Sequence, residues 1–164
     1  WVREDSHTTL AFFQRTEDPK IVYDFATYAY ANAPSDIKYQ GLELSYNNRL
    51  FEIVDFDLNY TFTQLKNGNL VRLPKHALNT NLNYVFKDQS NLGMFYTYRG
   101  ERQAVDLSTL EAYSLIDLRY AKSFYDDKLT ASVWLSNILD TEFIEITNFT
   151  TKGRNFRIGL AYQF

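Results

Sequence analysis

Cysteine is absent from this chain of 164 residues, and proline and glycine are scarce, with three and six residues. Without cysteine, the chain can build neither a disulfide framework nor a thiolate metal site. The low contents of proline and glycine argue against disorder and against a collagen-like structure. The formal net charge of −3 gives no reason to expect binding to nucleic acid.

Long apolar runs are also missing. No stretch reaches the roughly 18 consecutive apolar residues of a transmembrane helix, and the mean hydropathy is −0.38. A transmembrane β-barrel does not need such runs, because its strands alternate apolar and polar residues and their average stays hydrophilic. The composition therefore excludes a helical membrane protein but leaves a barrel open.

Aromatic residues are abundant, at 17% of the chain, and the C-terminal segment shows how they are used. Between 154 and 164, every second residue is apolar: Phe156, Ile158, Leu160, Tyr162 and Phe164. The residues between them are small or polar, which predicts a β-strand with one apolar and one wet face. A tilted strand of about 10 residues spans a bilayer. A closing strand that ends on Phe is typical of bacterial outer-membrane barrels.

Seven earlier segments also predict strands, which makes eight in total. They cover 7–24, 26–47, 53–65, 75–87, 91–100, 111–124 and 128–137. The alternation is clearest in 53–65, and Phe95 interrupts it in 91–100. We place a bend at 16–26, helped by Asp18-Pro19, although this region fits an extra hairpin as well.

The predicted connections alternate strictly between short and long. Tight turns rich in turn-forming residues are expected at 47–49, 87–90 and 125–127. Longer connections are expected at 66–73, 101–109 and 138–152. Transmembrane barrels have short periplasmic turns and longer external loops, so the C-terminus is predicted on the periplasmic side.

The side chains also indicate which face meets lipid. Asn79, Asn81 and Asn83 share one face of a strand, where buried amides would need partners but a water-filled lumen would not. Aromatic residues gather near strand ends, as in interface girdles: Tyr84, Phe86, Tyr96, Tyr98, Phe124 and Tyr125. The predicted fold class is all-β, with antiparallel transmembrane β-barrel strands. A soluble β-sandwich or lipocalin-like barrel would show the same alternation with its apolar side inward.

Four short stretches match known motifs in their order and spacing. They are Ile37-Lys38-Tyr39-Gln40-Gly41-Leu42-Glu43-Leu44, Leu73-Pro74-Lys75-His76 with Leu78-Asn79, Ser136-Asn137-Ile138-Leu139-Asp140-Thr141-Glu142-Phe143, and Gly153-Arg154 with the terminal strand. They resemble four segments of TonB-dependent outer-membrane receptors: (Arg/Tyr)-x-Gly-Val-Glu, Arg-x-Pro-x-His, Asn-(Leu/Ile)-(Phe/Leu)-Asp-x-x-Tyr and Gly-Arg-x-(Phe/Tyr). Each motif is weak alone, but together they are strong, and the resemblance covers nearly the whole chain.

The resemblance implies an outer-membrane transporter of a Gram-negative bacterium. Members of this family carry an N-terminal plug inside a 22-stranded barrel and import siderophores, haem or vitamin B12 with energy from the periplasmic protein TonB. Residues 1–164 are expected to form the last third of such a barrel, and the plug and the TonB-binding segment are not seen in this sequence. The order and lengths of the segments look closest to the cobalamin-transporter branch.

Neither catalysis nor metal binding is expected. Only His7 and His76 could serve an acyl-transfer site of the kind found in small outer-membrane enzymes. The carboxylate pairs Asp55/Asp57, Asp126/Asp127 and Glu142/Glu145 lack the spacing of a calcium loop, so solvated surface is the better reading. No cofactor is predicted.

The long connections supply the candidate ligand contacts, which are Arg72, Arg102, Phe143, Ile146 and Phe149. A loop that needed only solubility would not carry so many apolar residues as 138–152. Arg72, Lys75, Arg99, Arg102 and Lys152 lie near the same predicted rim, where they would attract an anionic ligand or pair with lipopolysaccharide phosphates. The same apolar residues could instead pack on neighbouring loops.

The terminal strand has a further role by resemblance. In this family, and in barrels generally, the last strand is read by the barrel assembly machinery, so Leu160, Tyr162 and Phe164 are predicted to form that signal.

The alternative function is a self-contained eight-stranded barrel acting as an anchor or adhesin, which would need a packed polar interior. The chain begins Trp1-Val2-Arg3-Glu4, so either a leader has been removed or it is a piece of a longer protein.

Overall fold

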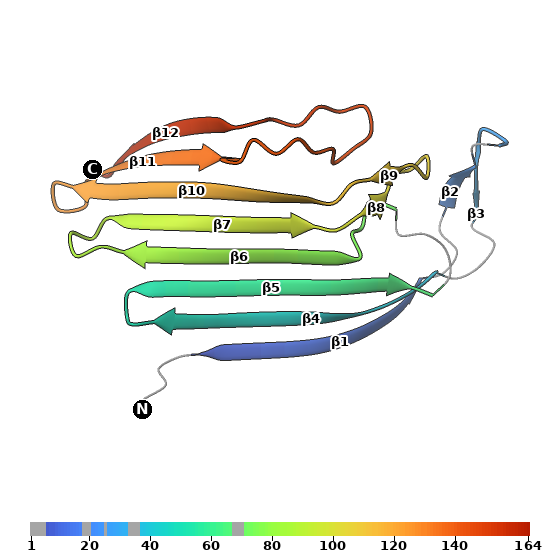
Figure 1. Cartoon of the computed structure of the whole chain (residues 1–164), viewed down its shortest axis with the longest axis horizontal. Helices are drawn as coiled ribbons and strands as arrows, with labels where there is room; N and C mark the ends of the chain where they lie inside the picture. Colours follow the sequence, from blue (N-terminus) through green and yellow to red (C-terminus); the bar gives the residue numbers. More distant parts are fainter. Residues whose placement is uncertain (1–5, 18–20, 25, 33–36, 67–70) are drawn as a thin grey trace.

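The computed structural model describes residues 6–17, 21–24, 26–32, 37–66 and 71–164. Its main feature is an antiparallel sheet of eight strands (Figure 1). Each of these strands pairs with the strand of the same sheet that follows it in the sequence. The strands are β1 (His7–Glu17), β4 (Ile37–Leu50), β5 (Val54–Leu65), β6 (His76–Val85), β7 (Asn91–Arg99), β10 (Tyr113–Phe124), β11 (Leu129–Ser136) and β12 (Asn155–Tyr162). None of the described residues belongs to a helix that could cross a membrane.

Two small hairpins interrupt the long connections. Strand β2 (Ile21–Asp24) pairs with β3 (Ala29–Asn32) between β1 and β4, and β8 (Arg102–Gln103) pairs with β9 (Thr109–Leu110) between β7 and β10. The prediction of two long strands over 7–24 and 26–47 was therefore wrong. An extra hairpin is present, as the alternative allowed, but its strands are 21–24 and 29–32 and it extends beyond the predicted region 16–26. The predicted bend residues Asp18-Pro19 lie outside the described residues.

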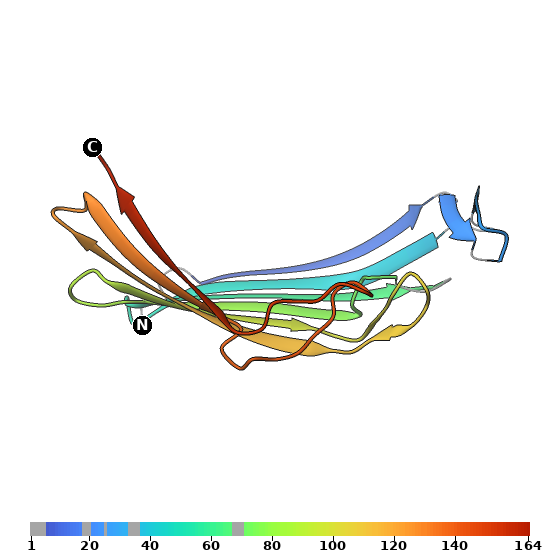
Figure 2. The same cartoon turned by 90° about the horizontal axis from the view of Figure 1, so that it is seen from above.

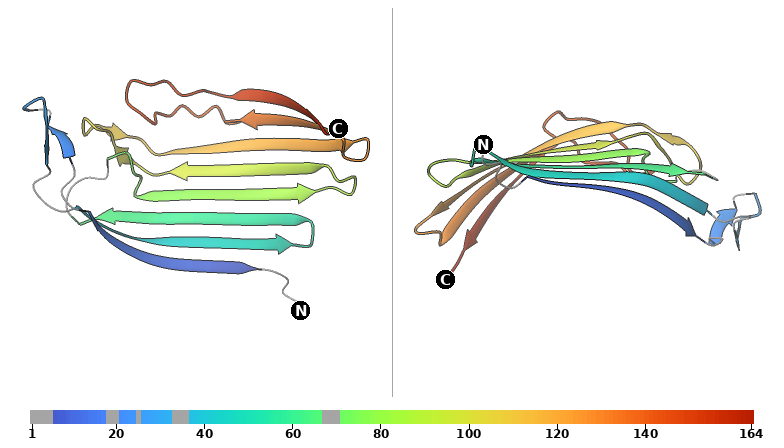
Figure 3. Two further views of the ribbon diagram at one scale, coloured as in Figure 1. Left: turned by 180° about the vertical axis from the view of Figure 1, so that it is seen from behind. Right: turned by 90° about the horizontal axis from the view of Figure 1, so that it is seen from below.

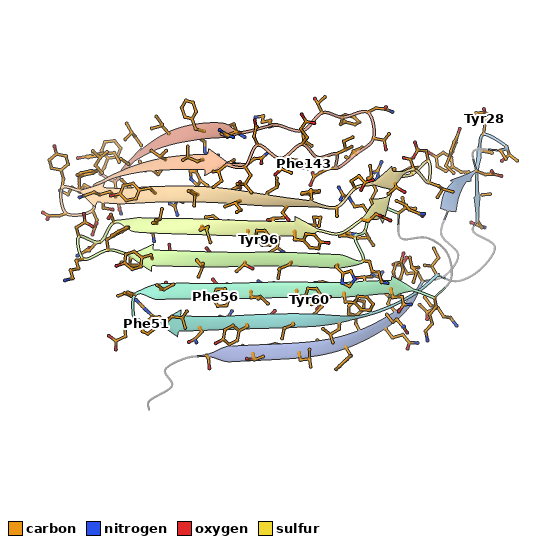
Figure 4. The ribbon with its side chains drawn as sticks, in the orientation of Figure 1. Tyr28, Phe51, Phe56, Tyr60, Tyr96 and Phe143 are labelled. Atoms are coloured by element: carbon orange, nitrogen blue, oxygen red, sulfur yellow. The ribbon has the colours of Figure 1, made fainter. Side chains whose placement is uncertain are left out.

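The turn of the first hairpin depends on Asp24. Its carboxylate accepts the backbone N–H of Ala26 at 2.8 Å and the hydroxyl of Thr27 at 2.9 Å. These donors, the Ala26 N–H first, lower the pKa of Asp24. Tyr28, at the tip in Figure 4, completes the turn with a φ of 52°. A side chain that binds the backbone two residues ahead therefore ends β2 early.

The turn between β4 and β5 also differs from the prediction. Asn47, Asn48 and Arg49 stay in β4, which continues to Leu50, and the chain reverses at 51–53. Phe51 and Glu52 adopt left-handed backbone angles there, with φ of 53° and 60°. The other two turns, near 86–90 and 125–128, agree with the prediction.

One face of the sheet is apolar along its whole width. In a single register row, Leu10 faces Leu44, Leu44 faces Tyr60, Tyr60 faces Leu78 and Leu78 faces Tyr98. Figure 4 labels Phe56, Tyr60 and Tyr96 from this face. The neighbouring strands keep the same alternation because each step along a strand changes the face.

The opposite face is polar. The next register row runs Thr9, Ser45, Asn59, Asn79 and Thr97, and Ser45 donates a hydrogen bond to Asn59 at 2.9 Å. Side chains of this face line a hollow of about 590 Å³, among them Asp55, Asp57, Asn81, Asn83 and Arg119. The hollow therefore lies on the polar face, and the sheet as a whole is curved (Figure 2).

The described residues have almost no buried core. None of their large side chains is fully buried, whereas Phe12, Ile158 and Leu160 on the apolar face are 76%, 67% and 74% exposed. A single layer with so much apolar surface is unstable in water, since burial of that surface is the main driving force of folding. The apolar face therefore needs to be covered from outside this sheet, by lipid or by another layer of protein.

The two ends of the sheet are unequal. The three turns and the C-terminus lie at one end, and the long connections lie at the other (Figures 1 and 3). Strands β1 and β12 form the two edges of the sheet and do not pair with each other. We call these ends the turn end and the loop end below.

We expect Gly41→Ala to destabilise the fold by about 1–3 kcal/mol. Gly41 lies opposite Phe13 and Thr63, and an added Cβ would overlap the Phe62 carbonyl oxygen and the Phe13 ring. The measurement is the urea midpoint for loss of the folded form of the full-length polypeptide in detergent.

The matched control is Gly159→Ala on β12. There the added Cβ would lie 2.8 Å from the Ser132 hydroxyl, which can rotate away. We expect a change of less than about 1 kcal/mol for this variant. Equal shifts in the two urea midpoints would contradict the assigned packing at Gly41.

Candidate functional site

The connection between β11 and β12 is closed at its base by hydrogen bonds that involve three side chains, those of Asn137, Asp117 and Asp140. Asn137 is buried, and its amide accepts the Thr141 N–H at 2.9 Å and donates to the Thr141 carbonyl at 3.0 Å. The backbone N–H of Asn137 donates to Asp117 on β10 at 2.7 Å. Asp140 accepts the N–H of Arg154 at 2.7 Å. The motif 136–143 therefore fixes where this loop leaves and rejoins the sheet.

A second set of contacts holds the same loop against β8, β9 and the start of β10. Arg102 is only 7% exposed and donates to the Ile144 carbonyl at 2.8 Å. Its guanidinium lies 5.1 Å from the centre of the Tyr113 ring. Tyr113 in turn donates to Glu145 at 2.7 Å and packs its ring 4.5 Å from that of Phe143. We call Arg102, Tyr113, Phe143 and Glu145 the loop clamp.

The hairpin β8–β9, which carries Arg102, has its own stabilised turn. The carboxylate of Asp106 accepts the hydroxyl of Ser108 at 2.6 Å and its backbone N–H at 3.1 Å. These two donors, the hydroxyl first, lower the pKa of Asp106. Asp106 thus stabilises the turn of the β8–β9 hairpin, against which the loop clamp holds the loop between β11 and β12.

Between the clamped loop and the strands lies a cavity of about 960 Å³. Its walls combine apolar and polar side chains from 108–113 and 140–153, including Phe143, Ile144, Phe149, Glu142 and Thr147. The cavity has the size and the mixed lining of sites that hold small organic molecules. Phe149 is 68% exposed at this site, whereas Phe143, which is labelled in Figure 4, is half-buried.

The predicted ligand contacts fall at three different places. Phe143 and Phe149 line the large cavity, and Arg72 and Ile146 line a smaller one of about 200 Å³ next to the β8–β9 hairpin. Arg102 is buried in the clamp, so the structure gives it a role in positioning the loop, and its contact with a ligand stays a prediction. The roles of Tyr113 and Glu145 in the clamp were missed, because nothing local in the sequence relates two residues so far apart.

Both histidines and Asp57 have structural partners. His76 accepts or donates a hydrogen bond of 2.7 Å with Tyr60 on the apolar face, and His7 lies 3.1 Å from the hydroxyl of Thr9. Asp57 accepts hydrogen bonds from Asn47 at 3.4 Å and from Asn81 at 3.3 Å. Within the described part of the chain, no cluster of three potential metal ligands occurs.

Aromatic rings on the polar face explain why Phe95 interrupts the alternation. Phe95 stacks on Trp134 at 5.5 Å across β10, with an angle of 22° between the rings. The guanidinium groups of Arg119 and Arg157 lie 5.4 Å and 5.5 Å from the centre of the Trp134 ring. The two rings therefore join β7, β10, β11 and β12 on the hollowed face.

Comparison with known proteins identifies the architecture. The family model described as TonB dependent receptor-like, beta-barrel, matches residues 1–138. The pyoverdine outer membrane receptor FpvA from Pseudomonas aeruginosa PAO1, solved bound to pyoverdine, is 21% identical with a TM-score of 0.78; the match covers 97% of this chain and 27% of that chain. The siderophore receptor PiuA from Acinetobacter baumannii is 16% identical with a TM-score of 0.78, over 99% and 26% of the two chains.

At 21% and 16% sequence identity, the structural likeness to these two receptors shows a shared fold and nothing more. This chain spans about a quarter of the length of the two receptors. No curated protein sequence matches it closely enough to count as a relative. The family match covers most of the sequence, and the strand order and the apolar outer face agree with it. The chain belongs to the β-barrel part of the TonB-dependent receptor family, whose members lie in the outer membrane of Gram-negative bacteria.

Proposed function

We propose that this chain is part of an outer-membrane transporter that imports an iron–siderophore complex with energy supplied through TonB. The observation that carries the proposal is the family match over residues 1–138. The structural neighbours add the ligand class, since they include a receptor bound to pyoverdine and the siderophore receptors PiuA and PirA. The family consists of transport receptors, which favours transport over catalysis.

The open edges of the sheet support membership of a larger barrel. Strands β1 and β12 leave rows of backbone N–H and C=O groups unpaired, which cannot face a lipid bilayer. A closed eight-stranded barrel, the alternative as anchor or adhesin, would pair these two strands and fill its interior with side chains. The proposal is therefore that residues 1–164 form the C-terminal part of a 22-stranded barrel that encloses a plug domain.

The intact mass of the native polypeptide tests this assignment directly. Because the chain covers 27% and 26% of the two receptors, we expect about four times the 19.3 kDa of the present sequence. Mass spectrometry of the protein extracted from its own outer membrane gives the answer. A native mass near 19.3 kDa would contradict the transporter and favour the small barrel.

The large cavity at the loop end is the proposed place of ligand contact. Phe149 and Phe143 offer aromatic surface to an organic ligand, and Ile146 and Arg72 extend this surface toward the β8–β9 hairpin. Arg72 and Lys152 are exposed cations that would attract an anionic ligand to the mouth of the barrel. The cobalamin branch and haem stay alternatives, which binding to a panel of ligands would separate.

We expect Phe149→Ala to weaken binding of the cognate ferric siderophore by roughly tenfold, because an exposed ring in the cavity loses its contact area. The measurement is equilibrium binding to the complete receptor, with ferric siderophores, cyanocobalamin and haem as ligands. Leu139→Ala is the control, since Leu139 is 59% exposed on the same loop but does not line the cavity. Tight binding of cyanocobalamin alone would instead establish the cobalamin branch.

We also propose that Leu160, Tyr162 and Phe164 form the signal for barrel assembly. Phe164, two residues beyond the end of β12, is fully exposed and packs its ring edge-on against Tyr162 at 5.2 Å. We expect Phe164→Asp to reduce the amount of folded receptor in the outer membrane severalfold. Gln163→Asp, which adds the same charge one residue away on the other face, is the matched control.

A third variant separates the assembly signal from simple contact with lipid. Ile158 lies on the same face as Phe164 but farther from the strand end, so a charge there lies deeper in the bilayer and costs more. If lipid contact alone mattered, Ile158→Asp would reduce assembly more than Phe164→Asp. A stronger effect of Phe164→Asp supports the signal.

A further inference from the structure

The apolar face of the sheet changes its chemistry near the loop end. Beyond Phe12, Leu42 and Phe62, the next side chains of the same face are glutamines on three adjacent strands. Gln14 pairs with Gln40, and Gln40 pairs with Gln64, to which it donates at 3.5 Å. The lipid-facing surface thus ends at a row of amides, where hydrocarbon gives way to polar headgroups.

Lysines follow the glutamines. Lys38 lies two residues beyond Gln40 on β4 and therefore on the same face. The N–H of Lys66 donates to the Lys38 carbonyl at 2.9 Å, which continues the ladder and sets the two residues opposite each other. The ammonium of Lys75 lies 5.7 Å from the centre of the Phe62 ring on this face. We call Lys38, Lys66 and Lys75 the lysine cluster.

The charge of the lysine cluster is not balanced within the described part of the chain. None of its members forms an ion pair with a described carboxylate. Glu17, near the loop end of β1, pairs with Ile37 and so lies on the opposite face, where it bonds Arg15 at 3.1 Å. Like charges in opposite positions of neighbouring strands repel. An anion from outside these strands would therefore stabilise the lysine cluster.

A lysine at the turn end shows the contrast. Lys122 lies on the same apolar face, but its ammonium bonds Asp88 at 2.7 Å. That hydrogen bond, with those from Ser90, holds the pKa of Asp88 well below its usual range. Among the described residues, a carboxylate thus pairs with the lipid-facing lysine at the turn end, whereas no described carboxylate pairs with the three lysines at the loop end.

We propose that the lysine cluster binds the phosphate groups of lipopolysaccharide in the outer leaflet. Phosphates carry close to two negative charges and are ordinary partners of lysine ammonium groups. The glutamine row would donate to the sugar and ester oxygens below them, and Phe12, Leu42 and Phe62 would contact the acyl chains. The inference rests on the outer-membrane location of the receptor and does not depend on which nutrient it imports.

The test titrates the complete receptor in detergent with hexa-acylated lipid A, followed by native mass spectrometry. The variant Lys38→Gln/Lys66→Gln/Lys75→Gln should bind lipid A with about tenfold lower affinity, since each lysine near an anionic headgroup contributes to attraction. The control Lys87→Gln/Lys122→Gln/Lys128→Gln removes the same charge from lysines at the turn end and should bind as the unmodified receptor does. Replacing the cluster with three arginines should preserve binding.

Lipid A without phosphates shows which part of the lipid is recognised. It should bind the unmodified receptor as weakly as intact lipid A binds the cluster variant. Equal loss in both triple variants, or equal binding of lipid A with and without phosphates, would overturn the proposal. Equal binding of phosphatidylglycerol, or full competition by inorganic phosphate at millimolar concentration, would also overturn it, because the site would then be a general anion site.

Two further measurements keep the result interpretable. The folded fraction of each variant is read from its SDS-resistant band, and if the cluster variant does not fold, Lys75→Gln takes its place, since Lys75 lies outside the strands. Uptake of the imported ligand is measured in parallel in Lys38→Gln/Lys66→Gln, which keeps the rim residue Lys75, and should be unchanged. Loss of lipid A binding with normal uptake separates this site from the proposed transport function.

Discussion

The backbone ladder is the constraint on which the rest of this structure depends. In a bilayer every backbone N–H and C=O needs a partner within the protein, and an antiparallel sheet supplies it strand by strand. Because the described residues bury almost no core, register alone decides which side chains meet. A slip of one residue would turn the asparagines and aspartates of the hollowed face toward lipid. Contacts such as Phe13 over Gly41 and Phe95 on Trp134 tie neighbouring strands in one register.

The two ends of the sheet have different structural tasks, and their side chains differ accordingly. The turn end needs only to reverse the chain, and it does so with left-handed residues and with the Asp88–Lys122 pair. The loop end must hold long segments in place, which Asn137, Asp140 and the loop clamp accomplish through hydrogen bonds to backbone groups. Apolar side chains such as Phe149 are thereby kept at the cavity.

Much of the fold was predictable from the sequence, because period-two alternation is a local property that each strand carries by itself. The turn at 47–49 was misplaced because Asn47 and Asn48 are common turn formers, yet here their amides bond Asp57 and Tyr46 within the sheet. The turn instead uses Phe51 and Glu52, which no turn rule would select. The candidate site was predictable only in part: its apolar loop could be seen, but the clamp joins Arg102 to Ile144 across 42 positions.

The same register that separates lipid from lumen also sets the depth of each side chain in the membrane. On the outer face, leucines and aromatic rings give way to Gln14, Gln40 and Gln64, and the next row holds Thr16, Lys38 and Lys66. A polar residue on this face is costly at the bilayer centre and favourable at its edge, so this order is what a wall ending in charged headgroups requires. Strands β1, β4 and β5 therefore carry, in their outward positions alone, the boundary between hydrocarbon and headgroups.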